Sequence, residues 1–397
     1  TPNLVFLLIV NHLNKLLIAF INIIFFVSCA SNIQDNSYQS KELISIDKPK
    51  VVYNFKKLPK RINVFLLDTN QTTEREFING LSINYYYYKN LSNYSPEINF
   101  ITSKKIDEGN CKLNKDSQDY SIILLNDTFL GRLDPYCLNK LLNLNGILIL
   151  SSDNLKVEEL NQEVLHVNRQ NEYRDLLTYA KNNRSKNSLI IDDENTRDKD
   201  ILGKIWLNLE GKVLDSSTSG SNLNENLLSN LLLIERSKER SRKLSRILSV
   251  PLESTPRRRM DLDSIILSVS LTKARSLKPE LEYNYGESLQ VYLLPNWEND
   301  EYYLKKELDL ERVVLIDMPW MLNTEINYLR NLPKKRNRSF AIGYDAYEIA
   351  LLLNNSSSSK QFQLSGMSGK IIYYRGSLLR KSPKVSVQDG LFKMIGY

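Results

Sequence analysis

Cys29 is the side chain whose position most clearly predicts covalent chemistry. It directly follows Ser28 and an apolar run over residues 16–27, and Lys15 is the one charged side chain before that run. Such a run behind a basic residue is typical of a secretory signal. A small residue directly before a cysteine is the pattern at which bacterial lipoproteins are cleaved and acylated on the thiol. The sequence therefore predicts a signal peptide over residues 1–28 and lipid attachment at Cys29, with several acyl chains giving a stable anchor.

Two alternatives to this anchor are an uncleaved membrane helix over residues 4–26 and plain secretion. Asn11, His12, Asn14 and Lys15 interrupt the helix, and such polar residues are unfavourable in hydrocarbon. Ala30 occupies the second mature position, where Asp would retain a lipoprotein at the inner membrane. We therefore expect a lipid-anchored protein on the periplasmic face of the outer membrane.

Cys111 and Cys137 are the remaining two of the 3 cysteines. An oxidising compartment permits a disulfide, and two cysteines allow only one pairing. Two free buried thiols are the alternative.

The residue inventory opposes an enzyme. The 397 residues include only 2 His and 14 Gly, so histidine-based triads, multi-histidine metal sites and glycine-built phosphate loops are disfavoured. No Cys/His/Asp cluster has the spacing of a metal site, and we expect no catalytic residue, metal or cofactor. The net charge of +7 is mild for this length and does not argue for nucleic acid. Composition favours a binding or scaffold protein.

Clustered basic residues are the candidates for contacting a partner. Arg257, Arg258 and Arg259 precede Asp261 and Asp263, so they form either a positive patch or an internal network of ion pairs with these carboxylates. A predicted helix over residues 226–248 carries further bases in its second half, which indicate a solvated face or a binding surface. Its candidate contact residues are Arg240 and Arg242.

Apolar strands alternate with helical patterns along the chain, which predicts an α/β fold with parallel strands covered by helices on both faces. The expected strands are 62–67, 98–101, 120–125, 146–150, 188–191, 213–214, 264–269, 290–294 and 312–316. The expected helices are 74–89, 134–142, 172–181, 196–209, 226–248, 272–281 and 344–353. Residues 216–221 are expected to form a flexible loop, and residues 369–387 a hairpin.

Two successive α/β halves predict two Rossmann-like lobes around a cleft. Residues 29–59 are expected to link the anchor to a domain over residues 60–397. The first lobe takes about residues 60–165 plus part of the C-terminal region, and the second about 166–320. Trp320 follows the last long strand, where it either packs at a hinge between the lobes or stacks on a ligand.

The chain resembles the C-terminal domain of the LppC/LpoA lipoproteins, the activators of class A penicillin-binding proteins. The resemblance is strongest over residues 237–248 and in the Arg-Arg-Arg-x-Asp-x-Asp block at residues 257–263. It continues through residues 273–279 and 283–292. Further motifs follow in the family's order: Asp-Met-Pro-Trp-Met-Leu at 317–322, Gly-Tyr-Asp-Ala-Tyr at 343–347 and Leu-Ser-Gly-Met-Ser-Gly at 364–369. Weaker similarity reaches back to Gly80.

The resemblance implies the fold of type I periplasmic binding proteins and a non-enzymatic regulator that binds and stimulates a class A penicillin-binding protein. Two departures are visible. Full-length members carry a large helical repeat domain where this chain has residues 30–59, and the usual Pro and Gly of the first loop are absent from residues 68–73. The alternative function is a solute-binding lipoprotein for a small periplasmic ligand, because a fold does not fix a function.

Overall fold

The computed structural model describes residues 59–67, 70–91, 95–102, 119–126, 129, 132–150, 162–167, 169–194, 198–219, 227–295, 306–322, 326, 329, 332–355 and 361–397. All structural statements below concern these residues. Contacts divide the chain into the units Thr1–Glu42 and Leu43–Tyr397, and every described residue belongs to the second unit. The predicted signal peptide, nearly all of the predicted linker, Cys29 and Cys111 lie outside the described residues.

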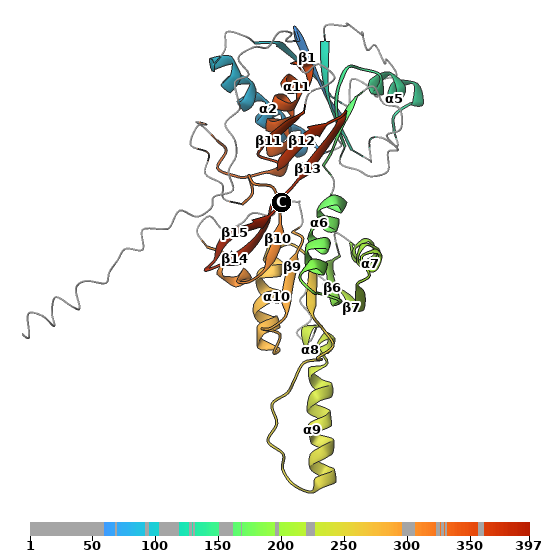
Figure 1. Ribbon diagram of the computed structural model, residues 1–397, viewed down its shortest axis with the longest axis vertical. Helices are drawn as coiled ribbons and strands as arrows, with labels where there is room; N and C mark the ends of the chain where they lie inside the picture. Colours follow the sequence, from blue (N-terminus) through green and yellow to red (C-terminus); the bar gives the residue numbers. More distant parts are fainter. Residues whose placement is uncertain are drawn as a thin grey trace, which may run out of the picture. The chain divides into compact units, whose positions relative to one another are not determined.

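The first half of the described chain forms a parallel five-stranded sheet (Figure 1). Leucine and isoleucine dominate its central strands, which are buried on both faces as expected for parallel sheets. Ile62 on the first strand lies beside Ile98 on one neighbour and Tyr120 on the other. The strands run in the order β2 (Glu97–Thr102), β1 (Arg61–Leu67), β3 (Asp119–Leu125), β4 (Gly146–Leu150) and β5 (Glu163–His166).

Helices cover both faces of the first sheet. Helices α2 (Gln71–Leu91) and α11 (Arg338–Asn355) pack on the face that carries Val64 and Ile122. Helix α5 (Pro135–Leu142) packs on the opposite face. Asp134 begins α5 by accepting hydrogen bonds from the backbone N–H groups of Tyr136 and Cys137, as an N-cap residue does.

The second sheet has seven strands, of which five are parallel and two are added antiparallel at one edge. The added strands come from the C-terminus, so the sheet combines segments far apart in the sequence. Its strand order is β15 (Leu391–Gly396), β14 (Lys384–Gln388), β10 (Val314–Ile316), β9 (Gln290–Leu293), β8 (Ser264–Ser268), β6 (Asn187–Asp193) and β7 (Lys212–Ser219).

Helices also cover both faces of this second sheet. Helices α6 (Arg169–Asn182) and α7 (Lys199–Asn208) pack on one face around Trp206, which is fully buried. Helices α8 (Leu227–Leu231) and α10 (Leu271–Tyr283) contribute to the core on the other face. A short 3₁₀ helix, η1 (Leu308–Leu310), precedes β10. The predicted α/β class with two parallel sheets is confirmed.

A third, antiparallel sheet lies next to β5 of the first sheet. It consists of β11 (Phe362–Ser365), β12 (Lys370–Tyr374) and β13 (Ser377–Lys381). The Tyr373 hydroxyl donates to Glu163 Oε1 (2.7 Å), which joins β12 to β5. The chain thus passes between the two large sheets three times: after β5, after β10 and after β13.

Two glycines allow α2 and α11 to touch backbone to backbone. A Cβ atom on Gly80 would lie 2.0 Å from the carbonyl oxygen of Phe340, and one on Gly343 would lie 2.1 Å from that of Phe77. Further along this contact, the rings of Tyr85 and Tyr347 meet edge to face at 5.9 Å. The close approach explains why both positions need glycine.

Two local predictions were wrong, and a third was correct over only part of its range. The helix predicted over 226–248 is divided into α8 and α9 (Ile234–Leu248), because Leu233 is left-handed (φ 58°) and turns the chain between buried Leu232 and Ile234. Part of the predicted loop at 216–221 belongs to β7, which extends to Ser219 because β6 supplies a ladder of backbone hydrogen bonds. The predicted hairpin at 369–387 is the β12–β13 hairpin followed by a crossing to β14.

Candidate functional site

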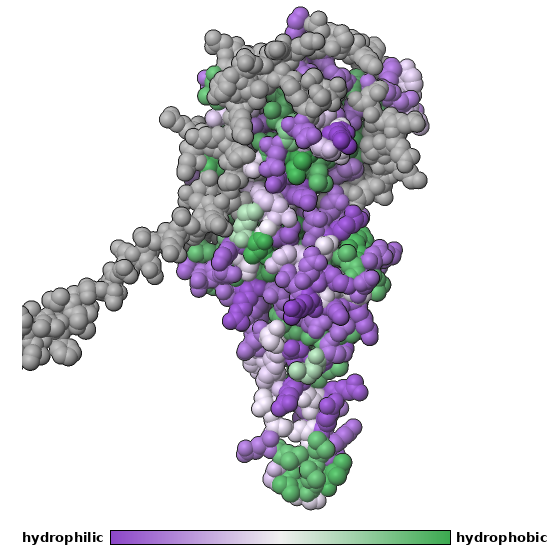
Figure 2. All heavy atoms as spheres, in the orientation of Figure 1, coloured by the Kyte–Doolittle hydropathy of each residue, from purple (hydrophilic) through white to green (hydrophobic). Residues whose placement is uncertain are grey.

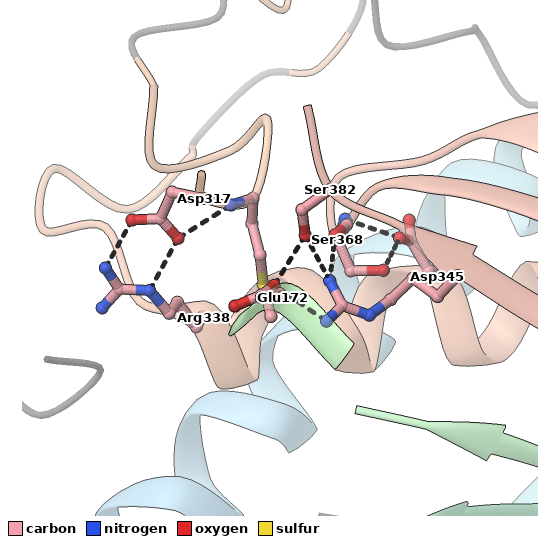
Figure 3. Close-up of polar contacts among 8 residues, drawn as sticks. Glu172, Asp317, Arg338, Asp345, Ser368 and Ser382 are labelled. Carbon is pink, nitrogen blue, oxygen red and sulfur yellow. Dashed lines mark hydrogen bonds and ion pairs between the residues drawn. The ribbon is translucent and has the colours of Figure 1, made fainter. Parts of the chain in front are cut away.

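A buried polar cluster lies where the three crossings meet (Figure 3). It draws on the start of α6, the segment after β10, α11, the turn between β11 and β12, and the end of β13 with the residue that follows it. We call it the junction network, and its members are Glu172, Asp317, Arg338, Asp345, Ser368, Arg380 and Ser382. All seven are at least nine-tenths buried, so their polar and charged groups are stable only because they are hydrogen-bonded or paired.

Asp317 and Arg338 form a bidentate ion pair within this network. Arg338 Nε donates to Asp317 Oδ1 (2.8 Å), and Nη2 donates to Oδ2 (2.5 Å). The backbone N–H of Met318 also donates to Asp317 Oδ1 (2.7 Å). This fork fixes the segment that leaves β10 to the first turn of α11.

Asp345 organises the turn between β11 and β12. Its carboxylate accepts hydrogen bonds from Met367 N (2.8 Å), Ser368 N (2.6 Å) and Ser368 Oγ (2.5 Å). A Cβ atom on Gly366 would lie 2.4 Å from Asp345 Oδ2, so the turn approaches the carboxylate as closely as it can. Two segments that carry the family resemblance therefore meet at this carboxylate.

Arg380 connects this turn to the first helix of the second half. Its Nη1 donates to the carbonyl oxygen of Ser368 (2.8 Å) and to Ser382 Oγ (2.8 Å), and its Nη2 donates to Glu172 Oε1 (2.9 Å). Ser382 Oγ donates to the same Glu172 oxygen (2.7 Å). One arginine thus ties together the first and the third crossing.

Trp320 packs beside the network, in agreement with the packing interpretation. Its side chain is 2% exposed and stacks on Phe340 with ring centroids 5.2 Å apart. The Arg336 guanidinium lies over the indole ring at 5.0 Å and donates to the carbonyl oxygen of Trp320 (2.6 Å). The backbone N–H of Trp320 donates to the carbonyl oxygen of Met367 (3.0 Å), which joins the segment after β10 to the β11–β12 turn.

Burial dominates the electrostatics of the junction carboxyls. Burial raises the pKa of Asp345 to about 6, although the hydrogen bonds from Ser368 and Met367 act in the opposite direction. Burial also raises the pKa of Glu172, against the lowering effect of Arg380. The network therefore holds the crossings in place, and Asp345 is sensitive to protonation at mildly acidic pH.

A second polar cluster lies at the carboxyl ends of β6 and β7 in the second sheet. Lys273 Nζ bridges Asp193 Oδ1 (2.9 Å) and the carbonyl oxygen of Ser219 (2.9 Å). Asp192 is fully buried and its Oδ2 accepts from Lys199 N (3.2 Å), whereas its Oδ1 has no hydrogen-bond partner among the described residues. The carboxyl ends of parallel strands are the edge at which open α/β sheets bind ligands.

Asp198 completes this edge from the start of α7. Its Oδ2 accepts hydrogen bonds from the Tyr173 hydroxyl (2.5 Å) and from Ser268 Oγ (2.8 Å), and it pairs with Arg169 Nη1 (3.2 Å). Arg169 also donates to the carbonyl oxygen of Pro295 (3.2 Å). Arg169 and Tyr173 both come from α6, so this edge adjoins the helix that carries Glu172.

The structure divides the predicted arginine block between internal contacts and solvent. Arg259 forms a bidentate pair with Asp261 (2.8 and 2.9 Å), which lowers the pKa of that carboxyl. Arg258 donates to the carbonyl oxygens of Arg259 and Leu262. Arg257 uses its backbone N–H to bond Ser237 Oγ, and its side chain is exposed. Asp263 does not pair with an arginine and accepts instead from the backbone N–H groups of residues 186 and 187.

The other predicted residues lie apart from the junction network. Arg240 and Arg242 are exposed on α9. Cys137 is disulfide-bonded in α5, and the predicted bridge to Cys111 stays a prediction because Cys111 lies outside the described residues. No helix in the described part of the chain is both long and apolar enough to span a bilayer. Within the same ranges, no three His, Cys, Asp or Glu side chains cluster as metal ligands.

The sequence reasoning did not identify Glu172, Arg338 or Arg380. Glu172 and Arg380 are separated by 208 residues, so no local pattern connects them. One available signal was an arginine near the start of a strongly apolar helix, since Arg338 opens α11 and a buried charge requires a partner.

Comparisons with known proteins agree with this architecture. Residues 218–374 match the family model described as "LppC putative lipoprotein". The chain is 24% identical over 187 residues to the penicillin-binding protein activator LpoA of Photobacterium profundum. That alignment covers 43% of this chain and 30% of the length of the relative.

Two solved structures are similar to the chain in fold. The C-domain of Haemophilus influenzae LpoA, described as a regulator of PBP1A, aligns with a TM-score of 0.55 and 13% identity over 84% of this chain and 99% of that one. A branched-chain amino acid ABC transporter protein from Rhodospirillum rubrum aligns with a TM-score of 0.57 and 12% identity over 85% of this chain and 100% of that one. The fold is therefore that of periplasmic binding proteins, and residues 218–374 are similar to the LppC family.

Proposed function

We propose that the chain is a lipoprotein, anchored at the periplasmic face of the outer membrane, that binds a class A penicillin-binding protein and activates it. The observation that carries the proposal is the LppC match over residues 218–374. This range includes the arginine block and the Asp317, Asp345 and Ser368 contacts of the junction network. The similarity to a penicillin-binding protein activator supports the choice of partner.

Activation proceeds by binding and not by chemistry of this chain. The polar groups of the junction network are engaged with one another and deeply buried, as expected of groups that fix a shape. A bound regulator accelerates a synthase only if it has higher affinity for the active conformation. The relevant property is therefore a rigid surface that is complementary to that conformation.

The test is a glycan-polymerisation and peptide cross-linking assay on the organism's class A synthase with the purified full chain. A rate that increases and saturates with added chain supports activation. The matched controls are Asp317→Asn, which disturbs the junction network, and Asp261→Asn, which disturbs only an exposed ion pair. Activation should be lost in Asp317→Asn and kept in Asp261→Asn. Absence of binding to every class A synthase of the organism would contradict the proposal.

The membrane anchor is tested separately at Cys29. Replacing Cys29 by Ser removes the thiol that would carry the lipid, so acylation should disappear and the protein should be released from membranes. A variant that stays in the membrane with an uncleaved N-terminus would favour the membrane-helix alternative.

A small solute bound at the carboxyl edge of the second sheet is the second candidate function. The observation that favours it is the fully buried Asp192, whose Oδ1 has no partner within the described residues. A buried acceptor without a donor is unfavourable, and a cationic or hydroxyl group of a ligand would relieve it. Calorimetric titration with amino acids distinguishes this function, because Asp192→Asn should then abolish solute binding and leave synthase binding intact.

A further inference from the structure

Helix α9 and residues 249–260 form a hydrogen-bonded arm. Ser237, Ser241 and Ser245 recur at every fourth position of α9 and therefore share one face of the helix. Ser237 Oγ accepts from the backbone N–H of Arg257 (3.0 Å), Ser241 Oγ bonds Ser254 Oγ (2.5 Å), and Ser245 Oγ donates to the carbonyl oxygen of Val250 (2.6 Å). The returning segment thus lies along α9 (Figure 1). We call these two elements the arm.

The arm exposes apolar side chains at the end where α9 stops. Ile234 is the one buried residue of α9. Ile247 is 77% exposed, and Leu248, Val250 and Leu252 are 57%, 54% and 39% exposed. We call these four residues the apolar tip, which Figure 2 shows as a continuous hydrophobic cap. A clustered apolar patch of this kind on an otherwise polar element marks an interaction site.

The arm also holds most of the net charge of the protein. Residues 234–260 contain nine basic and three acidic residues, a net +6 of the +7 of the whole chain. The six bases of α9 cover about 200° of its circumference at 3.6 residues per turn, and the serine face occupies the rest. They are Arg236, Lys238, Arg240, Arg242, Lys243 and Arg246. Cations therefore surround the approach to the apolar tip on several sides.

The spacing of charges and tip matches the depth of a lipid headgroup layer. Arg240, Arg242, Lys243 and Arg246 precede Ile247 by one to seven residues, which places them about 2–11 Å behind it along the helix axis. The polar region of one leaflet is about 5–8 Å thick. With the tip at the boundary of the acyl chains, these four bases lie at the level of the phosphates, where anionic lipids attract them.

We propose that the arm docks on a bilayer surface that contains anionic phospholipid and inserts its apolar tip among the headgroups. A protein partner with an acidic rim would match a cationic stripe on one side of the helix. The cations of α9 instead face outward over about 200° of its circumference, which suits an extended anionic surface. The Coulombic attraction requires no matching arrangement of individual acids and weakens with salt. This contact is additional to lipid attachment at Cys29 and does not depend on the identity of the synthase.

A local fluorescence probe tests insertion in the full chain. Ile247→Trp is reconstituted in vesicles with brominated acyl chains, made either of phosphatidylcholine alone or of phosphatidylcholine with phosphatidylglycerol. Bromine quenching of the new indole is expected only with phosphatidylglycerol, and high salt should reverse it. The control is Leu207→Trp, which places the probe at a 59% exposed apolar position on α7 and should stay unquenched in both vesicles.

A charge-neutral variant tests the role of the bases. Replacing Arg240, Arg242, Lys243 and Arg246 by Gln in the Ile247→Trp chain should lower the equilibrium constant for insertion about a hundredfold or more. Quenching then falls to the level in phosphatidylcholine. None of the four side chains is buried, so the melting temperature should stay close to that of the parent. Equal quenching in both vesicles, or no quenching in either, would overturn the proposal.

Discussion

The Arg338 guanidinium faces the Asp317 carboxylate with two parallel hydrogen bonds, and their side chains are only 4% and 0% exposed. Asp317→Asn leaves this arginine without its counter-charge in a buried site. We expect a loss of about 3–5 kcal/mol in the free energy of unfolding, measured by urea denaturation. The control is Asp261→Asn, which breaks an equally bidentate pair whose carboxylate is 56% exposed, and should change stability by about 1 kcal/mol or less.

Stability should fall as the pH rises through the pKa of Asp345. The pKa of Asp345 is about 6 in the folded chain, whereas its usual value is 3.8, so the folded state binds an extra proton between these two pH values. That stabilisation is fully present below about pH 4 and is lost as the pH rises through about 6. The free energy of unfolding should fall by about 3 kcal/mol at most across this pH range, because one pKa unit corresponds to about 1.4 kcal/mol.

Urea denaturation at a series of pH values measures this dependence. Glu172 contributes with the same sign, because burial raises its pKa too. Asp345→Asn should be less stable overall, since its amide would face the Ser368 N–H, but should show a flatter profile between pH 4 and 6. An unchanged slope in this variant would exclude Asp345 as the source.

Two glycine-to-alanine substitutions should have opposite effects. Gly80→Ala forces a methyl group to within 2.0 Å of the Phe340 carbonyl oxygen, so α2 and α11 must separate. We expect a loss of about 2–4 kcal/mol, comparable to other overpacked cores. Gly203→Ala in α7 meets nothing within 4 Å and should stabilise the chain by up to about 1 kcal/mol. Thermal melting of both variants provides the comparison.

Reduction should destabilise the first half of the chain. If Cys137 is bridged to Cys111 as predicted, the bond closes a loop of about 26 residues, and opening it removes about 3 kcal/mol of stability. Peptide mapping with and without reductant identifies the bridge. Cys111→Ser should reproduce the reduced protein, and a Cys111→Ser variant that keeps the stability of the oxidised parent would contradict this pairing.

The sequence predicted the strands and helices better than their connections. The runs around Ile62, Ile122 and Ile190 are apolar on both faces, so each identifies a buried parallel strand without knowledge of its neighbours. The break at Leu233 was missed because leucines on both sides continue a helical pattern, and only the burial of Leu232 and Ile234 in the folded chain requires the turn.

The junction network was predictable only in part. Asp317, Asp345 and Ser368 were within segments singled out by the family resemblance, and the structure brings these segments together. Their partners were not predictable, because an arginine that pairs over 208 residues has the same local sequence signal as one in solvent. The exposed bases of α9 were predictable from composition, whereas the apolar tip depended on how residues 249–260 return along the helix.

The triple crossing between the sheets has a consequence for fragments of this protein. Neither half is a continuous stretch of chain, since α11 covers the first sheet and β14 and β15 complete the second. A single protease cut in one crossing segment leaves two other covalent connections on the path between the sheets. The cleaved chain should therefore migrate as two bands under denaturing conditions and still elute as one particle from a gel-filtration column.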